Sequence, residues 1–553
     1  MGAAFKGRWK RKMAKRYSES AVDAEQANAT GPWSPLKISV FRMLWIATVV
    51  SNTATWIHEV GAAWLMTSLA PSPLMVSLIQ VATSLPLFFL ALPAGALADI
   101  VNRRRLLIVT QSWMLITAAG MATITILGLT NPTSLLLFTF ALGIGAALNA
   151  PAWQAIVPEL VPREQLSAAV ALNSVGFNIA RAVGPAVGGV IVAAAGSQAA
   201  FALNAVSFLG VIFVLSKWRG TKKNSTLPPE QFFGAMMVGV RYARYAPNFR
   251  NVLGRAVLFI FPASALWALL PLLSRQELGL GASGFGGLLG AVGAGALGGA
   301  FLLPKLRKKY STDVVTGVAT IIFGLTLMIL SLVSSITLLV LSMLISGMTW
   351  LTLLSSLNVG AQAVSAPWVR ARALSVYLIC FFGSMAFGSV AWGGLANVTS
   401  IPVVLLTASI VCMAGVTLNR FLPLAATEDL NLSPSLHWPT PDISLEPEDS
   451  IQHVLTTIEY YIDPANSAEF LRIMKQLRLR RLKDGAIQWQ LYQDPSVKGR
   501  YWECFESGSW LEHLRHHERV SEIDKDLQEE ALAFHIRKAP PKVTHLLRER
   551  TDC

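Results

Sequence analysis

Seven carboxylates interrupt the long apolar part of the sequence between positions 38 and 422, and they are the residues that could do chemistry there. Six of them lie at or beyond the ends of apolar runs, whereas Glu59 lies inside one, directly after His58. Arg181 is the one Arg or Lys deep within an apolar run of the first half. A carboxyl group and an imidazole can exchange protons, so Glu59, His58 and Arg181 are the candidates for proton coupling.

Composition places these residues in a membrane. Apolar residues make up 53% of the 553 positions and charged residues only 14%, which is far from the balance of a soluble domain. An ionisable group inside a membrane costs on the order of a few kcal/mol, so it is a functional candidate by default. Two interpretations of Glu59 follow: a reversible proton carrier, or a charge that pairs with Arg181 or closes the mouth of a cavity.

The formal net charge of +14 does not indicate nucleic acid, because the basic residues lie beside apolar runs. Anionic lipid headgroups are the partners that this arrangement favours. The four cysteines show neither paired nor metal-ligand spacing, so we expect free thiols, no metal and no cofactor.

Twelve apolar runs follow one another, each near the length of about 20 residues that crosses a hydrocarbon core. Six precede a polar interruption and six follow it. They cover residues 41–66, 74–98, 106–129, 135–153, 166–194, 199–215, 252–273, 284–303, 314–333, 337–359, 373–396 and 403–422. The sequence therefore predicts an all-α membrane protein with twelve transmembrane helices in two six-helix bundles.

Lys and Arg fall on one side of these runs. One set of connections carries many basic residues, and the alternate set carries only Arg275. Because cytoplasmic loops carry the positive excess, we predict that both termini lie in the cytoplasm.

The polar interruption at 217–251 has the length and charge of a linker between two bundles. Phe232, Met236 and Val240 alternate loosely with Arg241 and Arg244. This pattern predicts an amphipathic helix on the inner leaflet, and a basic tether is the alternative.

The two halves are weakly repeated, as in many transporters. A shift of 204 positions places the Gly and the three Arg of 95–105 on the Gly and the basic residues of 299–309. Asn149 and Gln154 similarly resemble Asn358 and Gln362.

The stretch 95–105 reads Gly-Ala-Leu-Ala-Asp-Ile-Val-Asn-Arg-Arg-Arg and links the second and third runs. Its pattern closely resembles the loop signature of the major facilitator superfamily of transporters. The resemblance implies that Asp99 meets the start of the eleventh helix when the inside is closed, and a solvated charge is the alternative. The predicted cytoplasmic latch comprises Gly95, Asp99, Arg103, Arg104, Arg370 and Arg372.

The fifth run contains Gly184-Pro185-x-x-Gly188-Gly189, which looks like the antiporter signature of drug exporters in that superfamily. Ala180 and Ala171 stand where the signature has earlier glycines. Ordinary close packing is the alternative, and it is the role that we favour for the glycines. For Arg181 and Asn178 we expect a position facing a cavity.

Residues 142–164 together with 370–375 look like the bacterial branch that contains the enterobactin exporter and related secretion effectors. The resemblance covers about 35–425 and implies a bacterial inner membrane protein that moves small molecules. This branch leads us to expect an acidic residue near Thr55. Its absence leaves Glu59 as the substitute or argues against proton coupling.

Aromatic residues in the first, second, fourth and seventh runs could form an apolar substrate cavity. Interface belts or core packing explain most of them more simply. The candidates are Trp45, Trp56, Trp64, Phe88, Phe89, Trp153, Phe259, Phe261 and Trp267.

A different composition begins after Leu422, with a Pro-rich acidic linker and then a predicted βαββαβ order. The expected elements are strands at 454–462, 487–493, 501–506 and 543–547 and helices at 464–482 and 510–534. This order predicts a cytoplasmic ferredoxin-like domain, similar to the dimeric α+β barrels that include antibiotic-biosynthesis monooxygenases. For His513, His516 and His517 we expect a solvated helix face rather than a metal site.

The predicted domains are a basic cytoplasmic tail (1–36), the first bundle (37–218), a linker with an amphipathic helix (219–250), the second bundle (251–423), a linker (424–450) and the ferredoxin-like domain and tail (451–553). The predicted function is export of a small organic molecule by alternating access, with protons moving inward. Uptake is a second possibility. A membrane-tethered enzyme or sensor is a third, in which the last domain acts on a small hydrophobic molecule. We also expect that this domain is regulatory or forms a homodimer.

Overall fold

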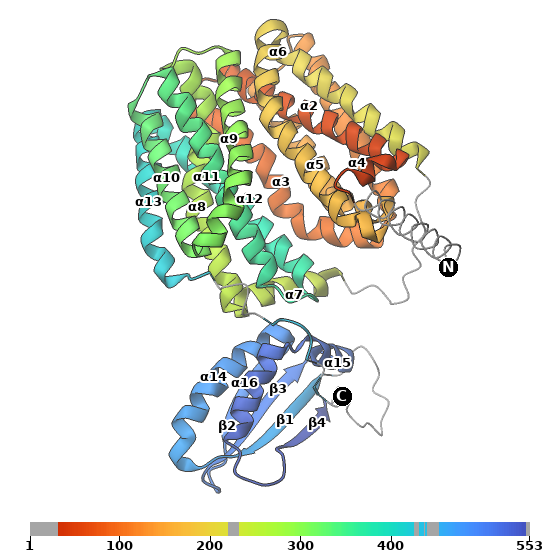
Figure 1. Cartoon of the computed structure of the whole chain (residues 1–553), viewed down its shortest axis with the longest axis vertical. Helices are drawn as coiled ribbons and strands as arrows, with labels where there is room; N and C mark the ends of the chain where they lie inside the picture. Colours follow the sequence, from red (N-terminus) through yellow and green to blue (C-terminus); the bar gives the residue numbers. More distant parts are fainter. Residues whose placement is uncertain (1–30, 219–231, 425–430, 436, 439–452, 549–553) are drawn as a thin grey trace, which may run out of the picture.

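A computed structural model describes residues 31–218, 232–424, 431–435, 437–438 and 453–548. A large helical body stands above a small α/β domain formed by the last part of the chain (Figure 1). Most of the predicted basic tail and of the linker at 424–450 lies outside the described residues.

The helical body contains long helices joined by short connections. Its elements are α2 (Ser39–Leu69), α3 (Pro73–Ile100), α4 (Arg103–Ile126), α5 (Pro132–Leu160), α6 (Leu166–Lys217), α7 (Phe232–Tyr245), α8 (Pro247–Leu272), α9 (Ala282–Lys309), α10 (Thr312–Leu332), α11 (Ile336–Ala363), α12 (Arg370–Val398) and α13 (Ile401–Leu418). Several begin with a capping residue followed by proline, as at Ser72-Pro73 and Asn131-Pro132.

Ten helices among the described residues are long and apolar enough to cross a membrane. α2 is not one of them, although it has 31 residues, because His58, Glu59 and several Ser, Thr and Asn residues lower its hydropathy. α6 is counted once but has 52 residues and breaks at Gly196, where φ is 76°. Glycine tolerates this backbone conformation, which other residues rarely adopt. The twelve predicted crossings therefore stay a prediction that rests on α2 and on the two parts of α6.

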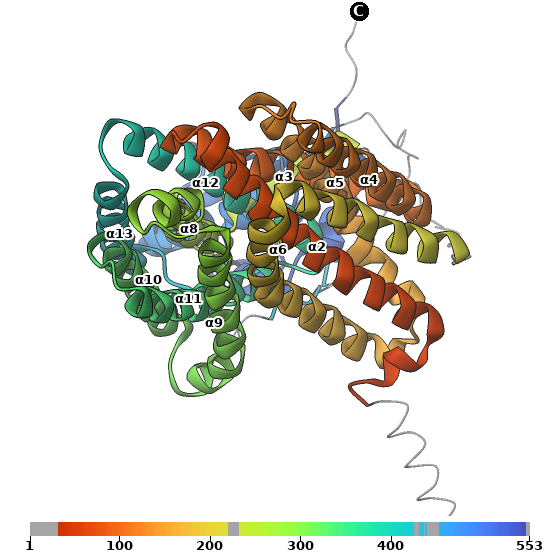
Figure 2. The same ribbon diagram turned by 90° about the horizontal axis from the view of Figure 1, so that it is seen from above.

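The helices form two groups. Seen from above, α4 and α5 lie on one side and α8, α10, α11 and α13 on the other, and α2 runs across the view beside α6 (Figure 2). The groups meet where α6 packs against α9 and where α3 packs against α12. We call these groups the first half (α2–α6) and the second half (α8–α13).

Small residues let α6 approach its neighbours closely. A Cβ on Gly188 would lie 2.9 Å from Ile57 Cα of α2, and a Cβ on Gly189 would lie 2.6 Å from the backbone oxygen of Ala282 of α9. A Cβ on Gly293 of α9 would lie 2.4 Å from Ala182 Cα. Any side chain at these positions would push the helices apart, so packing explains these glycines.

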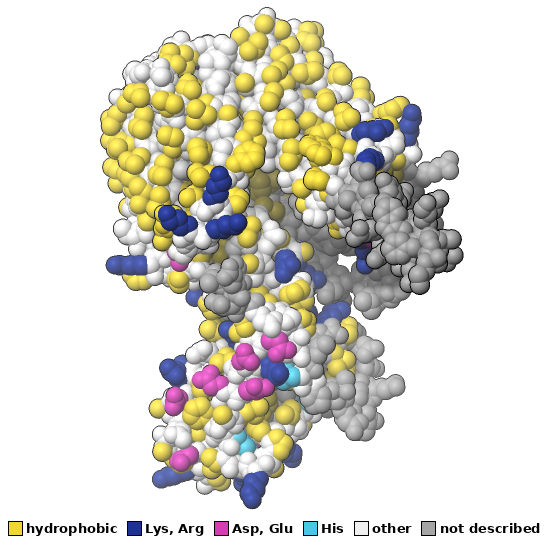
Figure 3. Space-filling view, in the orientation of Figure 1, with side chains coloured by type: hydrophobic (Ala, Val, Ile, Leu, Met, Phe, Trp, Pro, Cys, Tyr) yellow, Lys and Arg dark blue, Asp and Glu magenta, His cyan; other side chains and the backbone are white. Residues whose placement is uncertain are grey.

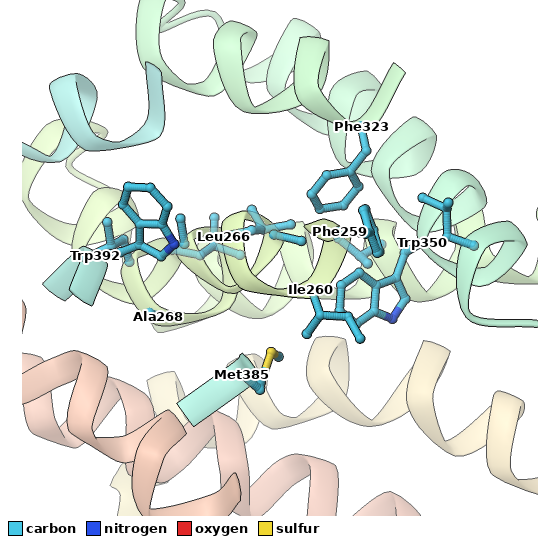
Figure 4. Packing of buried hydrophobic residues seen from close by; sticks show 14 of the residues in the cluster. Phe259, Ile260, Leu266, Ala268, Phe323, Trp350, Met385 and Trp392 are labelled. Carbon is cyan, nitrogen blue, oxygen red and sulfur yellow. The ribbon is translucent and has the colours of Figure 1, made fainter. Parts of the chain in front are cut away.

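Aromatic side chains fill the centre of the second half (Figure 4). The ring of Phe259 lies 5.2 Å from that of Phe323 and 5.6 Å from that of Trp350. Both Phe259 and Trp350 are buried. Of the aromatic residues considered for a cavity, Phe259 belongs to this core, and Phe261 and Trp267 pack against it.

The outer surface of the helical body is apolar over most of the visible face, and Lys and Arg gather toward the end that faces the small domain (Figure 3). Exposed side chains on this body include Val109, Ile116, Phe301 and Leu332. Such a surface suits lipid and not water.

The stretch 95–105 is mostly helical, which corrects its description as a loop. α3 continues to Ile100 and α4 begins at Arg103, so only Val101 and Asn102 lie between them. The side chain of Asn102 accepts a hydrogen bond from Arg105 N and so caps α4. The side chain of Asp99 is outside the described residues.

The predicted linker helix exists as α7, but one of its faces packs against protein. The hydroxyl of Tyr242 donates to Val364 O at 2.8 Å and accepts from Ala366 N at 3.2 Å. Arg241 forms an ion pair with Glu512 of the small domain at 3.5 Å. α7 therefore joins the second half to the small domain, and only its other face, with Met237 and Val240 exposed, is available to a membrane.

The small domain has a four-stranded antiparallel sheet in the order β2-β3-β1-β4. Its elements are β1 (Val454–Tyr461), α14 (Ser467–Asp484), β2 (Gln488–Gln493), β3 (Arg500–Ser507), α15 (Trp510–Arg519), α16 (Glu522–Ala533) and β4 (Lys542–Leu547). The helix expected at 510–534 is two helices, because Ser521 forms a capping box with Asp524 that starts a new one.

We predict that Gly189→Val weakens the contact between the halves. The new side chain would overlap the backbone of α9, and such overpacking costs about 1–3 kcal/mol. The purified variant should unfold at a lower temperature than the wild type and transport more slowly. Gly287→Val is the matched control, because a Cβ there meets no atom within 4 Å. Equal losses in both variants would contradict the prediction.

Candidate functional site

A cavity of about 410 Å³ lies between the two halves. Residues of α2, α3, α4, α5 and α6 line it from one side and residues of α8, α9, α11 and α12 from the other. Its walls are mainly apolar, and their polar members are Thr55, His58, Glu59, Gln80, Thr83, Thr139, Arg181 and Asn204. The predicted candidates Glu59, His58 and Arg181 therefore lie at one site.

Arg181 connects the two halves across this cavity. Its guanidinium carbon lies 6.0 Å from the ring centre of Trp56 in α2 and 5.9 Å from that of Trp267 in α8. Aromatic faces attract cations, most strongly where water is excluded. Glu59 is near enough to attract Arg181 electrostatically, so both interpretations of Glu59 stay open.

His58 is buried beside Glu59. Its ring lies 4.6 Å from that of Phe201 in α6, and neither ring nitrogen has a hydrogen-bond partner among the described residues. A buried imidazole without a polar partner has nothing to stabilise its charged form, so burial favours the neutral ring. Both Glu59 and His58 stay candidates for the proton site.

Thr55, at the position where the bacterial branch leads us to expect an acid, also lines the cavity. Its hydroxyl lies 3.3 Å from Asn204 Oδ1 of α6. Four further polar residues line the cavity and were not predicted from the sequence, namely Gln80, Thr83, Thr139 and Asn204. The feature of the sequence that could have identified them is a polar side chain inside an otherwise apolar run.

Two of the nine aromatic candidates, Trp56 and Trp267, line the cavity. Five others that the sequence did not single out also line it, namely Phe177, Phe285, Trp350, Phe381 and Phe382. The cavity thus offers a cation, a carboxyl group and several aromatic faces within an apolar wall.

The fifth-run signature lies next to the cavity rather than in it. Gly184 packs against α2, where a Cβ would lie 2.6 Å from Trp56 Cβ. Asn178 is not among the lining residues, and its Nδ2 donates to Ser174 O of the same helix at 2.8 Å. Gly184, Pro185, Gly188 and Gly189 therefore position Arg181 by helix packing.

Polar contacts join the halves at the end remote from the small domain. Arg275 Nη1 donates to Thr67 Oγ1 at 3.0 Å, and Gln276 Nε2 donates to Pro71 O at 3.2 Å. Ser72 Oγ donates to Asn397 Oδ1 at 3.1 Å. These contacts hold the two halves together at that end.

The predicted latch residues lie at the opposite end. Arg103 forms an ion pair with Glu159 at 2.7 Å, and Arg104 donates to Leu215 O and Ser216 O, all within the first half. Gly95 is near the start of α12, since its Cβ would lie 3.9 Å from Ser375 Oγ. The latch arrangement itself stays a prediction.

The histidines of α15 do not form a solvated face, which corrects the expectation. His513 and His516 are fully buried and His517 is partly buried. Burial lowers the pKa of His513 to about 3 and that of His517 to about 4. Ligand nitrogens of His513, His517 and His545 lie within 4.8 Å of one another. His513 packs with Trp510 and with His545 of β4, and His516 packs with Phe505 of β3.

Known proteins with similar sequences are membrane transporters, which agrees with a cavity between two groups of helices. The family described as transmembrane secretion effector, of the MFS type, matches residues 30–552. The staphyloferrin A transporter of Staphylococcus aureus is 25% identical over 49% of this chain and 69% of its own length. The multidrug efflux pump Tap of Mycolicibacterium fortuitum is 24% identical over 71% of this chain and 98% of its own length.

Solved transporters share the fold. A POT family transporter in complex with 5-aminolevulinic acid covers 69% of this chain and 96% of its own, with a TM-score of 0.56 and 15% identity. A bacterial homolog to the human lysosomal transporter Spinster, inward-facing and occupied, covers 70% and 95%, with a TM-score of 0.55 and 15% identity. The chain therefore belongs to the transmembrane secretion effector family of MFS-type membrane transporters.

Proposed function

We propose that this protein exports a small organic molecule by alternating access, in exchange for protons. The observation that carries the proposal is the cavity between the halves, where Glu59 and Arg181 are the charged residues of an otherwise apolar and aromatic wall. Relatives named as efflux pumps and as a siderophore transporter support export of small molecules.

The orientation that we propose places both termini and the small domain in the cytoplasm of a bacterium, with twelve crossings of the inner membrane. The basic residues at the end facing the small domain support it (Figure 3). For the limits of the two bundles, the linkers and the small domain, we propose the residue ranges predicted from the sequence. The small domain is proposed to be ferredoxin-like, which the sheet order β2-β3-β1-β4 supports.

The substrate class follows from the cavity wall. The aromatic faces suit a drug-like, siderophore or other metabolite with an apolar body. Arg181 would attract an anionic group on such a molecule, and Glu59 a cationic one. Binding would then disturb the attraction between Glu59 and Arg181.

Proton exchange at Glu59 gives the coupling a physical basis. A neutral carboxyl group is easier to hold in an apolar cavity than a carboxylate, unless Arg181 or a cationic substrate is beside it. Protonation of Glu59 and substrate binding would therefore compete, which is what antiport requires.

The end remote from the small domain, where polar contacts join the halves, is then extracellular, and we propose that the cavity opens toward the cytoplasm. We predict that a disulfide between Ser72→Cys and Asn397→Cys, which replaces an existing polar contact, holds this state and stops transport. Reduction should restore the rate, and each single variant should transport normally. Transport at the wild-type rate by the fully cross-linked protein would rule out alternating access at this end.

We predict that Asp99→Asn slows transport with little loss of expression. The family resemblance assigns this carboxylate to a contact with the start of α12, where Arg370 and Arg372 lie, and a carboxylate beside Arg forms a strong hydrogen bond. Glu164→Gln is the matched control, since Glu164 is an exposed acid of the same end. Normal turnover in Asp99→Asn would contradict the latch.

Export is tested in cells with and without the protein. Expression should lower the accumulation of its substrates, raise the tolerated concentration of toxic ones and increase secreted metabolites. In everted vesicles, a gradient with an acidic interior should drive substrate uptake. An unchanged susceptibility and an unchanged set of secreted metabolites would argue against export.

The same vesicles test Glu59. Glu59→Gln should abolish uptake driven by the gradient while substrate exchange without a gradient continues, because only the proton site is lost. Glu277→Gln, at an exposed position at the far end, should behave as the wild type. Uptake driven by the gradient at the normal rate in Glu59→Gln would show that Glu59 is not the carrier.

A homodimer through the small domain stays a prediction. The mass of the detergent-solubilised full chain, measured by light scattering, decides between one copy and two.

A further inference from the structure

Three histidines of the small domain converge although they come from two elements. His513 and His517 stand four residues apart on α15, a spacing that places both side chains on one face of a helix. His545 comes from β4, at the edge of the sheet. The rings of His517 and His545 each lie with their centres 4.8 Å from that of His513.

We infer that His513, His517 and His545 bind a divalent transition-metal ion of the Zn²⁺ class. Imidazole nitrogens suit such ions, and two histidines four residues apart on a helix are a known way to hold Zn²⁺. This site is independent of the transport cavity and of its proposed function.

The distance between the two helix histidines fits a metal centre. His513 Nε2 and His517 Nε2 are 3.2 Å apart. Two nitrogens bound to Zn²⁺ at about 2.0–2.1 Å with a tetrahedral angle are about 3.3 Å apart. His545 has a nitrogen within 4.8 Å of the other two, so a small side-chain movement completes a set of three ligands.

Hydrogen bonds within the described part of the protein account for only part of this cluster. His513 is fully buried, its Nδ1 has no partner there, and its Nε2 shares a hydrogen bond with His517 Nε2. A fold that buried these rings for packing alone would gain more from apolar side chains. A bound cation gives the facing nitrogens a common partner.

Two tryptophan rings flank the cluster. Trp510 lies 5.3 Å from His513 and 6.0 Å from His545, and Trp438 lies 4.7 Å from His517, between ring centres. Three protein ligands leave the fourth tetrahedral position for water or a small ligand.

The nearest positive charges are balanced by acids. Arg481 forms a buried ion pair with Glu503 at 3.0 Å, and Arg519 pairs with Glu512. His516, also on α15, is not part of the set, because its ring packs against Phe505 and Trp438. A cation between the three histidines therefore does not meet an uncompensated arginine.

The test uses the full chain in detergent, purified with an affinity tag that contains no histidine and freed of metal with a chelator. Zn²⁺ affinity is measured by competition with a coloured chelator, and Co²⁺ is added as a spectroscopic probe of four-coordinate geometry. We expect one Zn²⁺ per chain and an intense visible Co²⁺ spectrum. No stoichiometric Zn²⁺ binding by the wild type would overturn the inference without any variant.

Variants identify the ligands. His513→Ala, His517→Ala and His545→Ala should each weaken Zn²⁺ binding by more than about 100-fold, which exceeds the loss caused by removing an outer partner. His535→Ala is the matched control, because His535 bonds to Tyr461 N and Ala539 O elsewhere in the domain. If His513→Ala fails to fold, His545→Gln decides, since this side chain is only partly buried. Unchanged Zn²⁺ affinity in His517→Ala and in His545→Gln, or its loss in His535→Ala, would overturn the assignment.

Discussion

The close approach of α6 to its two neighbours is the constraint on which the helical body depends. Gly184 and Gly188 bring α6 against α2, and Gly189 brings it against α9 of the other half. Arg181, one turn before Gly184, is thereby held between a tryptophan of each half. In lipid, helices gain little from burying apolar surface, so contacts of this kind decide where helices meet. The glycines of α6 therefore determine where Arg181 lies in the cavity.

Long apolar runs and Lys/Arg placement made the helical body predictable from the sequence, because a membrane requires continuous helices of a set length. The break at Gly196 fell between two predicted runs for the same reason. α2 was found although its polar residues weaken its hydropathy, and three of those residues, Thr55, His58 and Glu59, line the cavity. The individual aromatic lining was not predictable, since Trp56 and Trp267 do not differ locally from residues that pack in the core.

Contacts between residues of distant elements could not be predicted from local sequence patterns. His513 and His517 were visible as neighbours on a helix, but His545 joins them only once β4 pairs with β1 beside that helix. The same limit applied to Tyr242, whose partners Val364 and Ala366 lie more than a hundred positions away. A pattern that predicts a surface helix cannot tell which of its faces another domain will cover.

The small domain is tied to the second half at the point where α12 begins. The guanidinium of Arg519 lies 4.5 Å from the ring centre of Trp368, just before α12, and Arg241 of α7 pairs with Glu512 of α15. Gly239 of α7 packs against Arg372, since a Cβ there would lie 3.2 Å from the Arg372 backbone oxygen. A rocking motion of one half against the other must therefore carry α7 and the small domain together with α12. α15 supplies Glu512 and Arg519 as well as two of the three clustered histidines. Any interaction that holds α15 in place therefore also holds the contacts of Glu512 and Arg519 with the helical body.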